Sequence, residues 1–179
     1  YHAVIDRTRE DTVARVKGDY RETLSDLMIE KSFPLWTAWC RQRGILTRNQ
    51  AHGSPGNLLD LYALADIPET EMFGRGARDP LASRFDPARF TEGDRNILVS
   101  KFASSAAHVA GKPLVSSETC TWMAEHFCET LEETKCFVDL MFAAGVNHVF
   151  YHGTVYSPDD AAWPGWLFYA STQMNPRNS

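Results

Sequence analysis

Carboxylates are the residues of this 179-residue chain whose types and spacing most directly suggest chemistry. Asp66, Glu69 and Glu71 stand within six residues of one another, behind a short apolar run. Another carboxylate, Glu118, follows a second run that is typical of a strand. An enzyme that hydrolyses glycosidic bonds needs at least two carboxyl groups, and the ends of two strands can provide them. Spacing alone leaves open the alternative that these are ordinary polar residues at strand ends or helix caps.

Hydrolysis of a glycosidic bond needs a carboxylic acid that protonates the leaving oxygen, and in one variant a second carboxylate that activates water. Crowding of like charges keeps one member of a carboxylate cluster protonated. The segment from Asp66 to Glu71 supplies that crowding. Glu69 follows Pro68 at the expected end of a strand, where a side chain can face a pocket. The carboxylate of Asp66 could place a negative charge beside Glu69, or it could bind a cation.

Further residues near the expected strand ends could contact a substrate. His52 and His152 fit two interpretations, as partners of hydroxyl or carboxylate groups or as hydrogen-bonded structural histidines. Trp122 could stack on the face of a sugar, although a single tryptophan more often packs in a core. We therefore take these three residues, together with Glu71, as candidates for substrate binding.

The elements that must position these residues follow a repeated pattern of helix, glycine, strand and polar loop. This pattern is typical of a parallel sheet in an α/β protein. We expect residues 45–49, 65–68, 113–117 and 148–151 to be parallel strands whose carboxyl ends lie on one side. In a (β/α)8 TIM-type barrel the active site lies at that end of the strands.

A complete barrel takes about 250 residues, more than this chain has. We therefore expect residues 1–179 to be a single domain that is the incomplete, C-terminal part of a barrel. The chain begins at Tyr1 rather than at a methionine, which favours a piece of a longer protein. The compartment stays open, with a periplasmic or secreted location as the hypothesis for that parent protein.

Composition excludes several classes of function. A net charge of -5 argues against a nucleic-acid partner. No apolar run approaches the 18 residues that a membrane-spanning helix needs, so we expect no membrane partner. The sequence contains no G-x-S-x-G, G-x-G-x-x-G or P-loop motif, which leaves serine hydrolases of the α/β type and nucleotide-binding folds without support.

Residues 50–60, 65–71 and 116–119 resemble glycoside hydrolase family 106, the α-L-rhamnosidases, and the resemblance extends to residues 145–148 and 164–165. It covers most of the chain from about Asp19 onward, and the run from His52 to Glu71 is its specific part. The resemblance implies a (β/α)8 catalytic domain, an inverting mechanism, dependence on calcium and a rhamnose-containing substrate. Family members are much larger proteins that carry accessory β domains.

The resemblance also implies roles for individual residues. Glu69 is the expected general acid, Asp66 its neighbour and Glu118 the general base, while Glu71 is an alternative for either role. The sequence itself names no calcium ligands. Two other functions stay open: a barrel glycosidase that acts on another sugar, and a carbohydrate-binding relative without turnover. The presence of both Glu69 and Glu118 favours catalysis over binding.

Overall fold

A parallel sheet is the centre of the fold in the computed structural model, which describes residues 7–73, 97–121, 123, 127, 129–168 and 172–174. Its four strands lie in the order β1–β2–β3–β4, and every neighbouring pair is parallel. The strands are β1 Arg48–Gln50, β2 Ile67–Phe73, β3 Ser116–Thr121 and β4 His148–Tyr151. The predicted parallel sheet is confirmed. The prediction that this sheet is the incomplete, C-terminal part of a (β/α)8 barrel stays a prediction, because the described strands form an open sheet.

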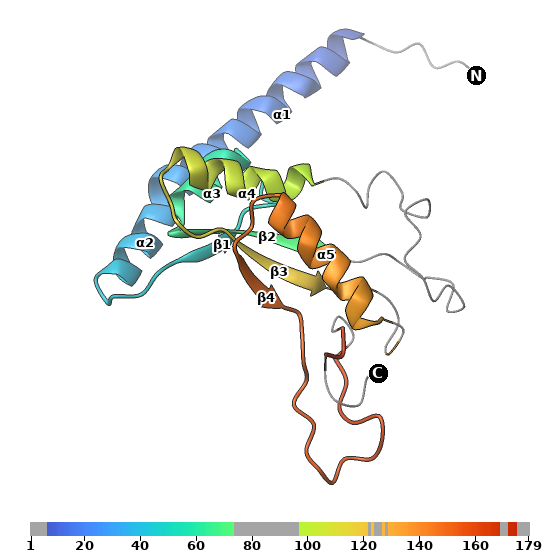
Figure 1. Cartoon of the computed structure of the whole chain (residues 1–179). Helices are drawn as coiled ribbons and strands as arrows, with labels where there is room; N and C mark the ends of the chain where they lie inside the picture. Colours follow the sequence, from blue (N-terminus) through green and yellow to red (C-terminus); the bar gives the residue numbers. More distant parts are fainter. Residues whose placement is uncertain are drawn as a thin grey trace, which may run out of the picture.

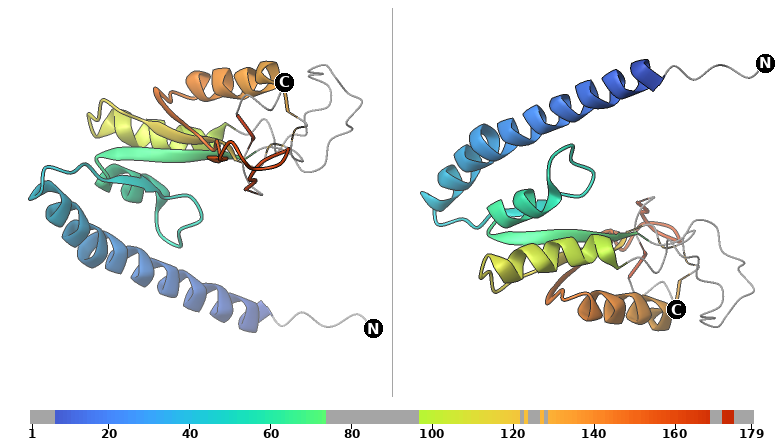
Figure 2. Two further views of the ribbon diagram at one scale, coloured as in Figure 1. Left: turned by 90° about the horizontal axis from the view of Figure 1, so that it is seen from below. Right: turned by 90° about the horizontal axis from the view of Figure 1, so that it is seen from above.

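Helices precede each strand or lie between strands, as the helix–glycine–strand pattern predicts. They are α1 Arg7–Leu27, a π-helical turn η1 Met28–Ser32, α2 Phe33–Arg41, α3 Leu58–Leu64, α4 Leu98–Val109 and α5 Leu131–Ala143. The long helix α1 projects away from the sheet (Figures 1 and 2). No helix in the described part of the chain is long and apolar enough to cross a membrane.

Local sequence explains where α5 begins and where the chain turns toward β4. Thr130 and Glu133 form a capping box, in which each side chain accepts a hydrogen bond from the other residue's backbone N–H. After α5, Gly145 has a φ of 96°, a conformation that costs other residues energy. A Cβ atom there would also lie 2.9 Å from the Cβ of Ser104 in α4. Glycine therefore allows α4 and the turn after α5 to approach closely.

One face of the sheet is covered by α3, α4 and α5. Thr70 in the middle of β2 contacts the Ser100 hydroxyl of α4 and the Tyr62 hydroxyl of α3, and Ser100 contacts Met141 of α5. Buried side chains fill the space between these layers: Leu61, Tyr62, Met72, Ala103, Ala106, Ala107, Phe137 and Met141. Because side chains alternate along a strand, Glu69 and Glu71 point to the opposite face.

Strand β4 has the predicted bounds, whereas β1, β2 and β3 begin two to three residues later than predicted, which changes the position of each carboxylate. The apolar runs at 45–47 and 113–115 lead into the sheet, whereas the paired residues of β1 and β3 are largely polar. Glu69 and Glu118 consequently lie inside β2 and β3 rather than after them. Asp66 precedes β2 and lies at the start of that strand, not at its carboxyl end.

Asp66 joins the end of α2 to the residues before β1. Its carboxylate accepts hydrogen bonds from the backbone N–H (2.9 Å) and hydroxyl (2.8 Å) of Thr47, and its own N–H donates to that hydroxyl. The Arg41 guanidinium lies 2.8 Å from the other oxygen. Burial alone would raise the pKa of Asp66, but the hydrogen bonds from Thr47 and Arg41 outweigh it and lower the pKa from 3.8 to about 2.

We predict that Asp66→Asn lowers the free energy of unfolding by roughly 2 kcal/mol at pH 7, because a charged acceptor loses several hydrogen bonds. The folded-state pKa is below the unfolded-state value, so the stabilisation is complete above about pH 4 and is lost as pH falls toward about 2. Urea unfolding at pH 7 and at pH 3 should show a smaller difference at pH 3. Asp26→Asn, at an exposed position of α1, is the control. An equal loss from both variants would contradict the role given to Asp66.

Candidate active site

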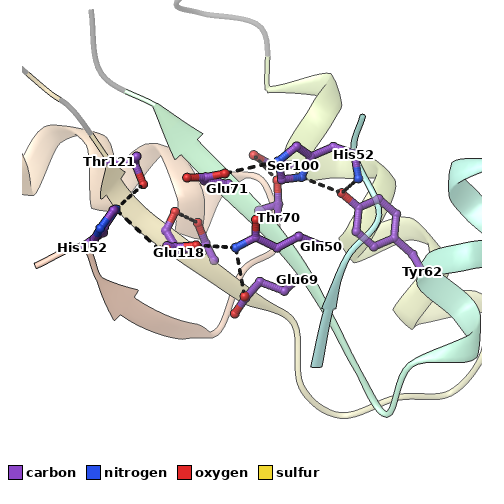
Figure 3. Close-up of polar contacts among 11 residues, drawn as sticks. Gln50, His52, Tyr62, Glu69, Thr70, Glu71, Ser100, Glu118, Thr121 and His152 are labelled. Atoms are coloured by element: carbon purple, nitrogen blue, oxygen red, sulfur yellow. Dashed lines mark hydrogen bonds and ion pairs between the residues drawn. The ribbon is translucent and has the colours of Figure 1, made fainter. Parts of the chain in front are cut away.

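Three glutamates from neighbouring strands share the face of the sheet that lies opposite α3, α4 and α5 (Figure 3). Parallel pairing places Glu71 beside Glu118, and places Glu69 between Gln50 and Ser116. Side chains at paired positions of a parallel sheet point to the same face. The register therefore gathers carboxylates from distant parts of the sequence, and each needs a partner that offsets like-charge repulsion.

Glu69 is the most deeply buried of the three, with 3% of its surface exposed. Its carboxylate accepts hydrogen bonds from the Ser116 hydroxyl (2.7 Å) and the Gln50 amide (3.1 Å). The Arg48 Nε lies 3.0 Å from it, and the Arg48 guanidinium also stacks on Phe150. All three groups donate hydrogens, so they stabilise the ionised carboxylate. The proton-donor role of Glu69 stays a prediction, and these contacts favour a structural role instead.

Glu118 is the most exposed of the three, with 35% of its side chain accessible. The Gln50 amide nitrogen that bonds Glu69 also lies 2.6 Å from Oε2 of Glu118. The His152 ring nitrogen Nδ1 lies 3.5 Å from Oε1 and 3.1 Å from the Thr121 hydroxyl. The amide donates to Glu118 and stabilises its ionised form, which suits a general base. Sequence reasoning gave Gln50 no role, although its position in the resembling segment was a signal.

Glu71 lies deeper than Glu118, with 12% of its side chain exposed, and it contacts His52. The distance from the His52 Nε2 to the Glu71 Oε2 is 3.3 Å. The other ring nitrogen of His52 is 3.4 Å from the Tyr62 hydroxyl, which also accepts the His52 backbone N–H at 3.2 Å. Burial raises the pKa of Tyr62, so its hydroxyl stays protonated at physiological pH. His52 is thus held between a carboxyl group and a buried phenol.

The separation of the carboxyl groups bears on mechanism. The oxygens of Glu69 and Glu118 that share the Gln50 nitrogen lie 3.1 and 2.6 Å from it, so they are less than about 6 Å apart. This is shorter than the roughly 6.5–9.5 Å of an inverting acid and base. The nearest ligand atoms of Glu71, Glu118 and His152 lie within 4.8 Å of one another. The face therefore holds a compact cluster rather than two separated carboxylates.

The same cluster provides a test of the calcium implied by the family resemblance. Its three donor atoms lie close enough for a single cation to touch them all. Calcium, however, takes six to eight oxygen ligands. Two carboxylates and one imidazole nitrogen do not meet that preference, and Glu118 already accepts the Gln50 N–H. These three residues alone do not fit a calcium site.

The structure brings together most of the candidate site residues that the sequence indicated. One cluster contains Glu71, Glu118, His52 and His152. Glu69 lies next to this cluster, within the sheet. Asp66 is not part of it, because its carboxylate is bound to Thr47 and Arg41. Its predicted role beside the acid stays a prediction that these contacts do not support. Trp122 lies outside the described residues.

Comparisons with known proteins place the chain among glycosidases. A rhamnosidase structure from Novosphingobium sp. PP1Y is 25% identical, with a TM-score of 0.62, over 79% of this chain and 13% of that chain. A Formosa agariphila protein named "Putative beta-glucuronidase" is 28% identical over 166 residues, which are 92% of this chain and 13% of that protein. The chain thus spans about an eighth of the length of each. The sequence profile of the glycoside hydrolase 106 family, described as α-L-rhamnosidase, matches residues 4–179. The chain belongs to glycoside hydrolase family 106.

Proposed function

We propose that this chain forms part of the active site of an inverting glycosidase that releases terminal α-L-rhamnosyl units from a carbohydrate. The observation that carries the proposal is the cluster of Glu71, Glu118, His52 and His152 on one face of the parallel sheet in a chain of this family. The four strands would be a segment of a (β/α)8 barrel, whose interior that face would line. Residues 1–179 would then be a part of that one domain.

Glu71 is the better candidate for the general acid. Its carboxyl group is nearly buried and contacts an imidazole, whereas Glu69 is surrounded by donors that stabilise its ionised form. In the reaction, the Glu71 proton moves to the glycosidic oxygen as the bond from that oxygen to the sugar breaks. Glu118 takes a proton from the attacking water, which adds its oxygen to the anomeric carbon.

Inversion requires room for that water, so Glu118 must lie further from the acid when the sugar is bound. It has the freedom to move, because its side chain is 35% exposed and is held by one amide and a 3.5 Å contact to His152. If Glu118 stays in its present place, the short separation favours a retaining reaction in which it attacks the sugar. The stereochemistry of the product distinguishes the two.

We predict that the sugar first released from an α-L-rhamnoside is the β-anomer, because water attacks the face opposite the leaving group. Proton NMR within the first minutes, before mutarotation equilibrates the anomers, measures this in the full-length protein that carries the chain. An α-anomer formed first would establish the retaining alternative. Absence of any rhamnose release from aryl and alkyl α-L-rhamnosides, set against release of a different sugar from its own glycosides, would overturn the substrate assignment.

We predict that Glu71→Gln lowers kcat/KM for an alkyl rhamnoside by about 10²–10⁴-fold, the usual contribution of general acid catalysis. The loss should be much smaller for a nitrophenyl rhamnoside, because a good leaving group needs little protonation. Glu69→Gln should lower both rates by the same factor, since it removes the partner of Arg48 rather than a proton donor. Glu132→Gln, at an exposed position of α5, is the control. If the loss of kcat/KM in Glu69→Gln is instead larger for the alkyl than for the nitrophenyl rhamnoside, Glu69 is the general acid.

Calcium dependence is part of the proposal as a property of the full-length protein, because the family resemblance implies it. We predict that EGTA abolishes rhamnosidase activity and that added calcium, but not magnesium, restores it. Full activity after dialysis against EGTA, with calcium absent by elemental analysis, would contradict the prediction.

A further inference from the structure

Strand β3 contains one residue more than its neighbour β2 beside the candidate site. Met72 of β2 pairs with Thr119, and the next residue of β2, Phe73, pairs with Thr121. Cys120 therefore has no partner in β2. It also has a φ of 70°, in the left-handed region that residues other than glycine rarely adopt. An extra residue of this kind is a β-bulge, and bulges next to active sites change the direction of a side chain.

The bulge reverses the alternation of side chains along β3. Glu118 lies on the site face, and Thr119 is fully buried on the opposite face. In a regular strand the next residue, Cys120, would return to the site face, but it is fully buried in the hydrophobic core. Thr121 takes that place instead, because its partner in β2 lies on the site face. The bulge thus replaces a thiol at this position by a hydroxyl group.

The hydroxyl group of Thr121 contacts His152, which directly follows β4 and lies beside Glu118 (Figure 3). It is 3.1 Å from the Nδ1 atom of His152, and the same nitrogen is 3.5 Å from the Oε1 atom of Glu118. Only 5% of Thr121 is exposed, so this contact is largely shielded from water. Thr121 therefore fixes which edge of the imidazole ring faces Glu118.

The backbone groups around the bulge have hydrogen-bond partners. The Cys120 carbonyl accepts a hydrogen bond from the Thr172 hydroxyl. The Thr172 N–H donates to the His152 carbonyl at 3.4 Å, and the His152 N–H donates to the Thr119 carbonyl at 2.8 Å. These bonds connect the backbone of the bulge to that of His152. They compensate for the ladder bonds that the extra residue lacks, so the bulge is a stable part of the fold.

We propose that the β-bulge at Cys120 serves to position the active site, because it places Thr121 where its hydroxyl holds the His152 imidazole against Glu118. Thr121 is then a positioning residue for the general base, and Cys120 acts only through its backbone conformation. This inference rests on the proposed function of Glu118 as the base. An imidazole held in one place restricts the positions that the Glu118 carboxylate can take when it removes a proton from water.

The position of His152 can be measured apart from activity, in crystal structures of the full-length protein that carries this chain. Thr121→Val keeps the branched shape and removes the hydroxyl, so we expect the His152 ring to rotate and its Nδ1 atom to leave Glu118. Thr121→Ser keeps the hydroxyl and should retain both contacts of Nδ1. A His152 ring that stays beside Glu118 in Thr121→Val would overturn the proposal, as would a regular β3 without a bulge in the unsubstituted protein.

Substitutions of Cys120 test the backbone conformation. Glycine adopts a positive φ readily, so Cys120→Gly should keep the bulge and the rhamnosidase activity. A β-branched residue disfavours that conformation, so Cys120→Val should lower the activity as Thr121→Val does. Cys40→Val, at a buried cysteine within helix α2, is the matched control and should retain activity. Equal activities of Cys120→Gly and Cys120→Val would contradict the proposal, and the Thr121 variants test it even if Cys120→Val does not fold.

The catalytic consequence is a loss that does not depend on the leaving group. Thr121→Val should lower kcat by about 10-fold for both an alkyl and a nitrophenyl rhamnoside, with KM nearly unchanged, because water must be activated whichever group leaves. Thr121→Ser should restore kcat to within about 2-fold of the unsubstituted protein, since it keeps the hydroxyl that positions the base. A loss confined to the alkyl rhamnoside would connect Thr121 to the acid and overturn the proposal.

The two measurements separate this inference from the proposed function. If the full-length protein releases no rhamnose, but His152 leaves Glu118 in the Thr121→Val structure, the proposed function is wrong and the positioning of His152 by Thr121 is upheld. If rhamnose is released and kcat is unchanged in both Thr121→Val and Cys120→Val, the proposed function stands and the positioning role is overturned.

Discussion

Like-charge repulsion among three glutamates is the constraint on which the rest of this structure depends. Parallel pairing of β2 with β3 places Glu71 beside Glu118, and the alternation of side chains adds Glu69 to the same face. Each carboxylate is stabilised in a different way, by a guanidinium, an amide or an imidazole. These different partners are what can give chemically identical side chains different protonation states and therefore different roles.

The two ends of β2 differ in what their side chains do: those at the start stabilise the fold, and those toward the carboxyl end belong to the proposed active site. Asp66, before the strand, ties α2 to the residue before β1 through Arg41 and Thr47 and keeps a carboxylate ionised. Glu71, five positions further on, lies toward the carboxyl end among groups that can exchange protons. In parallel α/β folds the amino ends of the strands serve stability and the carboxyl ends serve binding and catalysis. The contacts of Asp66 and the proposed role of Glu71 follow this division along one short strand.

The sequence was sufficient to predict that four strands lie parallel in one sheet, because that prediction uses only local signals. Glycines after helices and short apolar runs are visible without knowing any long-range contact. It was not sufficient to predict which carboxylate faces which donor. Gln50 contacts residues 19 and 68 positions away, and Thr70 reaches Met141 only through Ser100. Such contacts depend on register, which a shift of two or three residues in strand boundaries already changes.

The alternation along β2 also limits how the length of this chain can vary. Odd positions of the strand carry the carboxylates, and even positions carry Thr70 and Met72, which pack under the helices. Inserting or deleting one residue within the strand would exchange the two sets, burying carboxylates in the apolar core and presenting Thr70 to solvent or sugar. A change of two residues would restore the faces but separate Glu71 from Glu118. Insertions and deletions are therefore tolerable only in the connecting loops, and β2 is a segment of fixed length.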